Sequence, residues 1–307
     1  MTQITKLEEL EHNFTGLLLD LIEQKTVKGP RTYGFEYEFI STKPLNLELM
    51  EKLSGFLQDC GFEPDGDYFR HPSGLHITFE PGGQIEYHSQ PLLAEDNDSF
   101  NRFLELIGKT NTNIYRELDI EYLATGYMPG RSDAPLCLKN KRYINLHARM
   151  QKCGSRGLEM MKGTASIHLH VGICDILELV PLFSCVCEMS AIEELKMGRD
   201  RRDIWDNTDP SRCGLPYHSI DKESGPKKVV EELVRVGLKA DDIDENVPFY
   251  LTKDLSFDAF MYHMTTIFTD VRMNIKGPSI ELRTTDSMPF EGFRSLWKRF
   301  ISLLEII

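Results

Sequence analysis

The chain of 307 residues carries 35 lysines and arginines against 48 aspartates and glutamates, a formal net charge of −13. This acidic balance argues against a general nucleic-acid binder, which needs a basic face to neutralise phosphates. Hydrophobic residues make up 41% and charged residues 27% of the sequence, which is typical of a globular protein, and no apolar run approaches the ~20 residues that span a bilayer.

The N-terminus and the cysteines indicate a compartment. Residues 1–11 hold three glutamates and no apolar block, unlike a signal or transit peptide. Seven cysteines at irregular spacing in a chain of this size do not suggest a disulfide framework, so we interpret Cys185 and Cys187, which lie in an apolar run, as buried free thiols. We therefore expect a soluble, cytoplasmic protein.

Hydrophobic periodicity predicts the elements of the first half. Apolar residues at every third or fourth position from Ile4 to Ile22 indicate an amphipathic helix, which the Lys28-Gly29-Pro30 segment ends. Residues 32–40 alternate between apolar and polar, as in a strand with one buried face. Helices are expected over residues 45–58 and 98–118, with a hairpin between them whose strands, 75–80 and 84–89, are joined by Pro81-Gly82-Gly83.

The second half has a less regular pattern. Residues 122–141 show no sustained periodicity and are expected to form an irregular connection. The predicted elements that follow are a strand over 164–174, a long helix over 182–197, a charged irregular stretch to Ser224 and a last strand over 279–284. Strands scattered among helices, without regular alternation, favour an α+β fold with a mixed or antiparallel sheet.

Each predicted strand turns chemically active side chains to one face. Glu36 and Glu38 are about 6.5–7 Å apart on one side of their strand, where they repel unless a cation or a proton lies between them; a solvated edge strand is the alternative. In the hairpin, a three-residue connection places Glu80 opposite Gln84 and puts Glu86 on the face of Glu80. A two-residue Gly-Gly turn would send the two glutamates to opposite faces.

Histidines and an arginine follow the same pattern on the later strands. His168 and His170 share one face and could both reach a metal, or they are hydrogen-bonded histidines of a sheet. Glu281 and Arg283 share a face on the last strand, where a cross-strand ion pair is the alternative. If these strands form one sheet, its polar face gathers five glutamates, two histidines and an arginine, which suits Mg²⁺ or Mn²⁺ bridging nucleotide phosphates.

The densest group of arginines, which includes Arg201, lies between Arg199 and Arg212. Trp205 lies in the same stretch, four residues after Arg201. A guanidinium clamp for phosphate or carboxylate groups is one interpretation, because arginine binds both bidentately. An exposed charged loop and a buried ladder of ion pairs are the alternatives.

Taken in chain order, these motifs resemble the plant-type glutamate–cysteine ligases. The resemblance runs from about Gly34 to Pro289, and the Glu80–Glu86 element and the His263–Phe268 stretch are its specific parts. The supporting matches are Gly34–Glu38, Met160-Met161 before Thr164, Arg201–Trp205, Thr208-Asp209, Arg212–Gly214, Val247–Tyr250, and the run to Arg272 before Glu281–Arg283.

The family's fold implies one catalytic domain over residues 1–307, glutamine-synthetase-like, with a curved, mainly antiparallel sheet and helices on its outer face. The family's reaction joins the γ-carboxylate of L-glutamate to the amine of L-cysteine through an acyl phosphate, with ATP as co-substrate and Mg²⁺ or Mn²⁺ as cofactor. This is a step of glutathione biosynthesis, and the implied partners are small molecules rather than nucleic acid or membrane.

The resemblance also implies roles for individual residues. The expected metal ligands are Glu36, Glu38, Glu80, Glu86, His168 and Glu281. The expected catalytic residues are Arg283 and Arg201. The expected contacts to ATP or the amino-acid substrate are Arg201, Trp205, Arg212, Arg283, His170 and Lys162.

The chain departs from the family pattern at three points. His168 and His170 stand where plant-type enzymes carry Gln and Asn, Gly163 stands beside Lys162 where the family has an arginine, and family members continue where this chain ends at Ile307, so the domain is expected to be shortened at its C-terminus. A ligase for another amine therefore remains open. A metal-dependent hydrolase without a nucleotide requirement and a non-catalytic ATP-binding protein are alternatives of other classes.

Overall fold

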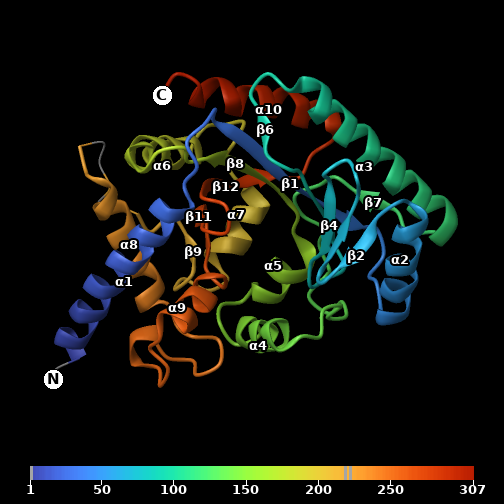
Figure 1. The fold of residues 1–307 in the computed structure, drawn as a ribbon. Coiled ribbons are helices and arrows are strands. Elements are labelled where there is room, and N and C mark those ends of the chain that lie inside the picture. Colours follow the sequence, from blue (N-terminus) through green and yellow to red (C-terminus); the bar gives the residue numbers. More distant parts are fainter. Residues whose placement is uncertain (1–2, 218–219, 221–222) are drawn as a thin grey trace.

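Ten strands form one sheet at the centre of the computed structural model, which describes residues 3–217, 220 and 223–307 (Figure 1). The neighbours in the order β11-β12-β8-β1-β5-β4-β3-β2 all pair antiparallel, and β6 and β7 pair with β1. The strands of this sheet are β1 (Thr32–Ser41), β2 (Glu63–Asp65), β3 (Tyr68–Arg70), β4 (His76–Phe79), β5 (Ile85–His88), β6 (Leu92–Leu93), β7 (Tyr122–Leu123), β8 (Ser166–Gly172), β11 (Val271–Asn274) and β12 (Ser279–Asp286). A separate parallel pair is formed by β9 (Cys213–Gly214) and β10 (Phe268–Thr269).

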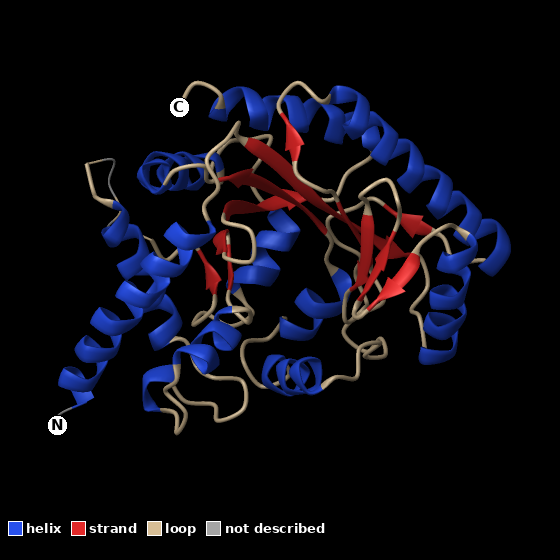
Figure 2. Cartoon of the chain, in the orientation of Figure 1, coloured by secondary structure: helices blue, strands red, loops and turns tan. Residues whose placement is uncertain are grey.

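Helices surround this sheet (Figure 2). The α-helices are α1 (Gln3–Lys25), α2 (Leu47–Asp59), α3 (Asn97–Leu118), α4 (Lys141–Met150), α5 (Gly157–Gly163), α6 (Leu179–Met189), α7 (Arg199–Asp206), α8 (Pro226–Lys239), α9 (Phe257–Met264) and α10 (Phe290–Leu304). Two short 3₁₀ helices, η1 (Ile176–Glu178) and η2 (Phe249–Leu251), complete the described elements.

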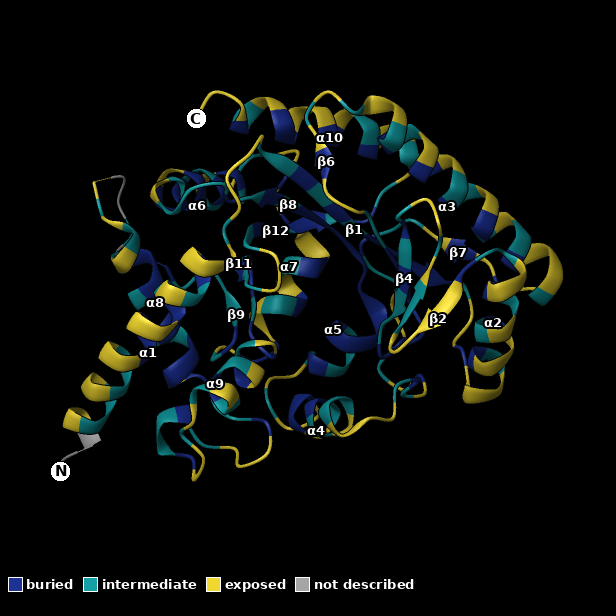
Figure 3. Ribbon diagram, in the orientation of Figure 1, coloured by how far each residue is buried: buried dark blue, intermediate teal, exposed yellow. Residues whose placement is uncertain are grey.

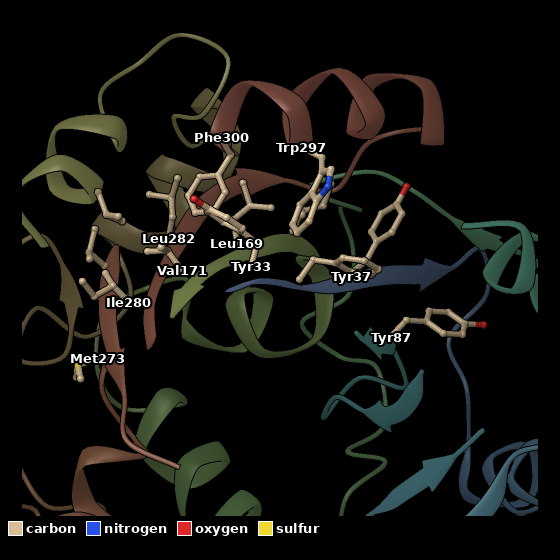
Figure 4. Packing of buried hydrophobic residues seen from close by; sticks show 14 of the residues in the cluster. Tyr33, Tyr37, Tyr87, Leu169, Val171, Met273, Ile280, Leu282, Trp297 and Phe300 are labelled. Atoms are coloured by element: carbon tan, nitrogen blue, oxygen red, sulfur yellow. The ribbon is translucent and has the colours of Figure 1, made fainter. Parts of the chain in front are cut away.

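The core lies between the apolar face of the sheet and the helices outside it. Phe35 on β1 makes edge-to-face contacts with Phe100 and Phe103 of α3 and with Phe293 and Trp297 of α10, at centroid distances of 5.2–6.3 Å. Figure 4 shows the side chains of β1, β8 and β12 meeting α10 on this face. Since alternate residues of a strand face opposite sides, the residues between them are left for the other face.

The fold class expected from the sequence is confirmed: the protein is α+β, with a mainly antiparallel sheet and helices on its outer face. The three-residue hairpin connection is also confirmed, because Phe79 pairs with Ile85, and the Glu80 amide donates to the carbonyl of Gln84 at 2.9 Å. Consequently Glu80 and Glu86 share a face, as predicted. The predicted strands and the first three predicted helices are present with small shifts of their ends.

Two predictions for the middle of the chain are wrong. The helix expected over 182–197 ends at Met189. The Ser190 hydroxyl donates to Cys187 O. In the turns that follow, Leu195 O accepts hydrogen bonds from the hydroxyls of Thr284 and Thr285 on β12. These tertiary hydrogen bonds override the apolar periodicity. The stretch expected to be irregular up to Ser224 contains α7 and β9, while its residues 218–219 and 221–222 lie outside the described part.

The cysteines are free, as expected, but Cys185 and Cys187 are half-buried rather than fully buried. Among the described helices, none has both the length and the apolar content that crossing a bilayer requires.

Removing the ring of Phe35 tests the importance of the aromatic cluster. We expect Phe35→Ala to lower the free energy of unfolding by about 3–5 kcal/mol, because a buried ring that contacts four others leaves a cavity that the sheet cannot close. Urea unfolding followed by circular dichroism measures this loss. The exposed Tyr115 on the same α3 supplies the control, Tyr115→Ala, which should change the stability by about 0.5 kcal/mol or less. Equal losses in the two variants would contradict this account of the core.

Candidate active site

The strand registers gather polar side chains on the inner face of the sheet. Glu36 on β1 pairs with His168 on β8 and with His88 on β5, and Glu38 pairs with Glu86 on β5. Directly opposite residues of antiparallel strands project to the same face about 5 Å apart. Because β1 is the central strand among these three, its two glutamates touch both neighbours, and the five side chains form one continuous cluster.

Imidazoles separate the carboxylates in this cluster. His168 Nδ1 lies 2.6 Å from Glu36 Oε2, and His168 Nε2 lies 2.7 Å from the Ser166 hydroxyl. His88 lies 3.0 Å from Glu86 and 3.5 Å from Glu36. The histidines therefore serve as hydrogen-bonding partners of the glutamates while keeping them close enough together to bind a shared ion.

A second group lies across β8, on β12 and β11. Glu281 is fully buried, at 0% exposure, and pairs in register with His170. Arg272 on β11 contacts Glu281 Oε2 through Nε at 2.8 Å and Nη2 at 2.7 Å, and Arg283 bonds Glu281 Oε1. The sequence left an ion pair as the alternative for Glu281 and Arg283, and the structure contains it within β12. Glu281 also forms a cross-strand ion pair with Arg272 of β11.

A cavity of about 220 Å³ opens over these groups. Its polar side is lined by Glu36, Glu38, Glu80, Gln84, Glu86, His88, Ser166, His168, Arg272 and Arg283. Its opposite side comes from α4, α5, α7 and β10 and is mostly apolar. The ribbons coloured by burial show α4 and α5 below the inner face of the sheet (Figure 3).

Burial and mutual charge shift the pKa values of the carboxyl groups in opposite directions. Burial alone raises the pKa of Glu36, but hydrogen bonds from His168, His170 and His88 hold it well below its usual range. Burial and the charge of Glu86 raise the pKa of Glu38 well above its usual range.

The same causes act at the ends of the cluster. Burial and the charge of Glu86 raise the pKa of Glu80 to about 8. At Glu281 the effect of burial is outweighed by Arg272 and Arg283, which lower its pKa to about 2. Without a further cation the site thus holds protons on some carboxyl groups at neutral pH.

The donor atoms fit divalent cations. Three groups of one histidine and two glutamates each bring their ligand atoms within 4.8 Å of one another. The three groups are Glu36, Glu86 and His88; Glu36, His170 and Glu281; and Glu38, Glu86 and His168. Carboxylate oxygens suit Mg²⁺ and Mn²⁺, and an imidazole in each group favours Mn²⁺ or another first-row metal more than it favours Mg²⁺.

Five of the residues predicted from the sequence lie outside the cavity lining: His170 and Glu281, which belong to the group on β8 and β12, and Arg201, Arg212 and Lys162. Arg201 is 1% exposed and donates to Thr285 O, Arg283 O and Asp286. Its guanidinium thus holds the end of β12. Trp205, whose ring centroid lies 5.1 Å from the guanidinium carbon of Arg201, is the predicted residue of α7 that reaches the cavity.

Arg212 and Lys162 also bond to protein groups. Arg212, 1% exposed, shares Asp209 with Arg149 at 2.8 and 2.6 Å, as in a buried ladder of ion pairs. Lys162 donates to Ser132 O and Ala134 O, so it fastens the 131–135 loop to α5. Direct contact of Arg201, Arg212 or Lys162 with substrate remains a prediction.

Among the lining residues that sequence reasoning missed, three carry an imidazole or a guanidinium group: His88, Arg142 and Arg272. His88 was available from the hairpin register, because it lies two residues after Glu86 on the same strand. Arg272 faces Glu281 only through the β11–β12 pairing. Arg142 comes from the first turn of α4, a helix whose approach to the sheet has no signal in the local sequence.

Comparison with known proteins gives a consistent picture. The model of the family described as Glutamate-cysteine ligase family 2 (GCS2) matches residues 32–191, just over half of the chain. The chain is 24% identical over 319 residues to the chloroplastic glutamate–cysteine ligase of Nicotiana tabacum, covering 90% of this chain and 57% of that protein. It is 23% identical over 318 residues to the chloroplastic glutamate–cysteine ligase of Arabidopsis thaliana, covering 90% and 59%.

The chain thus spans a little over half the length of these relatives. A solved structure described as a novel glutamine synthase homolog is similar at 10% identity and a TM-score of 0.27, covering 83% of this chain and 65% of the other. At that score the match adds nothing to the fold described above.

The ladder at Arg212 gives a prediction about stability. We expect Asp209→Asn to lower the free energy of unfolding by about 3–5 kcal/mol, because it leaves the guanidinium groups of Arg149 and Arg212 buried without their shared charge. Thermal and urea unfolding measure the change. The exposed Asp20 on α1 provides the matched variant, Asp20→Asn, which should be nearly neutral. A stable Asp209→Asn protein would show that Arg212 does not depend on this partner.

The affinity of the site for divalent cations should decrease as the pH decreases. A neutral carboxyl group must lose its proton to bind a metal. The pKa is raised well above its usual range at Glu38, a member of one of the three groups, and to about 8 at Glu80, an expected ligand that lies outside them. We therefore expect the affinity for Mn²⁺ to fall as the pH falls below 8, by up to about tenfold per pH unit. Titration calorimetry at pH 6.5, 7.5 and 8.5 measures it.

Two variants distinguish this site from nonspecific binding. Glu86→Gln should abolish the binding, whereas Glu63→Gln, at the exposed β2 edge of the same sheet, should leave it unchanged. Equal affinity at all three pH values would show that the raised carboxyl pKa values play no part.

Proposed function

Because this chain belongs to the glutamate–cysteine ligase family 2, we propose that it is an ATP-dependent carboxylate–amine ligase. Its substrates are then ATP, L-glutamate and an amine, and L-cysteine is the amine that the names of its relatives suggest. The observation that carries the proposal is the carboxylate and imidazole floor of one cavity, with Arg272 and Arg283 at its side.

The chemistry explains why such a floor is needed. A carboxylate is inert towards amines, so its oxygen first attacks the γ-phosphorus of ATP, the bond to the β-phosphate oxygen breaks, and ADP leaves. The amine nitrogen then attacks the acyl carbon, phosphate leaves with the electron pair of the broken C–O bond, and the nitrogen gives up a proton. Phosphate and carboxylate charges crowd the site in both steps, and divalent cations, when bound, supply positive charge there.

Residues of the chain would position this charge. The glutamates of β1, β5 and β12, together with His168, are the candidates to hold the cations. Arg283 and Arg272 are kept in place by Glu281, so their outer N–H groups can meet phosphate oxygens without first being ordered. Holding the reacting groups in line in a small cavity supplies a further part of the rate.

The test is ADP release by the purified protein with ATP, Mg²⁺ and L-glutamate, with and without L-cysteine, and mass spectrometry for γ-glutamylcysteine. We expect ADP and a glutamyl amide to appear together, and Glu86→Gln to reduce turnover by about 10²–10³-fold or more. Glu63→Gln on the exposed β2 edge serves as the control and should keep full activity.

Two results would contradict the proposal. Hydrolysis of an amide without any nucleotide would indicate the metal-dependent hydrolase. ATP binding without ADP release, with L-glutamate and any amine, would indicate the non-catalytic protein.

A further inference from the structure

His88 lies in a row of polar side chains that crosses the sheet. On β5 it pairs with Glu36 of β1 on one side and with His76 of β4 on the other. Because directly opposite residues of antiparallel strands project to the same face, His88 stands between a carboxylate and a second imidazole. The ligand set that the family resemblance implies does not contain His88, although this side chain lines the cavity together with Glu36 and Glu86.

Packing fixes the plane of the His88 ring. The rings of His76 and His88 are stacked at a centroid distance of 4.9 Å and an interplanar angle of 3°. The ring of Tyr68 lies edge-on to both of them, at centroid distances of 5.4 and 6.1 Å. These contacts involve ring faces and edges, so they orient the imidazole without using its nitrogens, as a preformed ligand requires.

Hydrogen bonds assign different roles to the two nitrogens of His88. The Thr78 hydroxyl donates to Glu86 Oε2 at 2.8 Å, and its oxygen lies 2.7 Å from His88 Nε2. Because a hydroxyl has a single proton, this oxygen accepts from Nε2; the Glu86 carboxylate, 3.0 Å from Nε2, is also an acceptor. Nε2 therefore carries the proton. In the neutral ring the lone pair is then on Nδ1, as in metal-ligating histidines whose other nitrogen donates to a second group.

His88 Nδ1 faces Glu36 at a distance that suits a shared ion. It lies 3.5 Å from Glu36 Oε1, which is longer than the separation of about 2.7–3.2 Å typical of a hydrogen bond between nitrogen and oxygen. Two ligands of one ion, each about 2.0–2.2 Å from it, are roughly 3–3.6 Å apart. The ligand atoms of Glu36, Glu86 and His88 all lie within 4.8 Å of one another, so these side chains can close around one cation.

The imidazole of the group that contains His168 is already engaged within the protein. Its two nitrogens lie 2.6 Å from Glu36 and 2.7 Å from Ser166. A cation bound by His168 would have to replace one of these hydrogen bonds.

The group that contains His170 has a different cost. Its buried carboxylate, Glu281, has one oxygen bonded to Arg272 and the other bonded to Arg283. A cation there would lie beside two guanidinium groups. Among the described residues, the glutamates of the His88 group form ion pairs only with histidines, so a cation in that group meets no such competitor.

The donor set decides which cation binds to the His88 group. Two carboxylate oxygens and one imidazole nitrogen suit the ions of first-row transition metals, whereas Mg²⁺ prefers oxygen ligands alone. Mg²⁺ also usually binds together with nucleotide phosphates rather than in a cage of protein ligands. A preformed group of two glutamates and one histidine can therefore bind a transition-metal ion before any nucleotide is present.

We propose that Glu36, Glu86 and His88 form a binding site for a transition-metal ion such as Mn²⁺, and that His88 Nδ1 makes this site prefer Mn²⁺ to Mg²⁺. Thr78 is a positioning residue, because its hydroxyl keeps the proton on Nε2. The inference rests on the proposed function in so far as it names the cofactor of the same cavity, but the binding itself requires no substrate.

Calorimetric titration of the metal-free protein with Mn²⁺ and with Mg²⁺, without nucleotide, tests the preference. We expect Mn²⁺ to bind more tightly than Mg²⁺. His88→Asn should weaken Mn²⁺ binding by about 10–100-fold and Mg²⁺ binding by less, because asparagine offers an oxygen in place of the nitrogen. His12→Asn, at an exposed position of α1, is the matched control and should change neither affinity. Equal affinities of the wild type for the two ions, or equal losses in His88→Asn, would overturn the proposal.

Pulsed electron paramagnetic resonance gives a readout that does not depend on affinity. With substoichiometric Mn²⁺ bound to the wild type, we expect the electron spin to couple to an imidazole nitrogen, and we expect His88→Asn to lose this coupling. A wild-type spectrum without nitrogen coupling would overturn the proposal. Coupling that persists in His88→Asn would also overturn it, because the ion would then lie at another histidine.

Two variants of Thr78 test the role of its hydroxyl and leave the stacked imidazoles in place. Thr78→Val removes the hydroxyl but keeps the shape of the side chain, and should lower the affinity for Mn²⁺ about tenfold. Thr78→Ser keeps the hydroxyl and should bind Mn²⁺ as the wild type does. If circular dichroism shows that His88→Asn does not fold, this pair still decides the proposal, since equal affinities in the two variants would contradict it.

The ligase assay separates this inference from the proposed function. ADP release by a protein that does not prefer Mn²⁺ would overturn the metal site and keep the ligase. Mn²⁺ bound through His88 in a protein that releases no ADP with any amine would overturn the ligase and keep the metal site.

Discussion

Repulsion among buried carboxylates is the constraint around which this structure is arranged. Glu38 and Glu86 are opposite one another in the sheet and are 7% and 5% exposed, so water screens their charges little. Imidazoles lie between some of the glutamates, and arginines surround Glu281, but burial and the charge of Glu86 keep the pKa values of Glu38 and Glu80 raised. A sheet face of this kind cannot be covered by an apolar layer, because burying unpaired charge costs more than the apolar contacts return.

The two faces of the sheet consequently have different roles. On the outer face, the rings of Phe35, Phe293 and Trp297 pack against one another and stabilise the fold. On the inner face, α4, α5 and α7 enclose a cavity and form their own small apolar cluster. The strands can therefore hold mutually repelling side chains in place on one side because their apolar side is fully packed on the other.

The helices over the cavity are held by buried polar contacts as much as by apolar ones. Arg149 of α4 and Arg212 share Asp209, and Arg201 of α7 bonds to the end of β12. In sequence these arginines resemble a phosphate clamp, and in the structure they bond to protein acceptors. They fix the position of Trp205 and of the apolar residues of α4 opposite the glutamates.

The sequence alone determined the strands and the residues that share a face within each strand, because these depend on a two-residue period. It left two registers open for the hairpin, and the pairing of β4 with β5 selected the three-residue connection. It also indicated the family, whose motifs are local. The tertiary structure decided where the helix after Leu179 ends, that Arg201 and Arg212 are buried, and that Arg142 joins the glutamates. These depend on hydrogen bonds and ion pairs between segments up to about a hundred residues apart, and no local pattern encodes such partners.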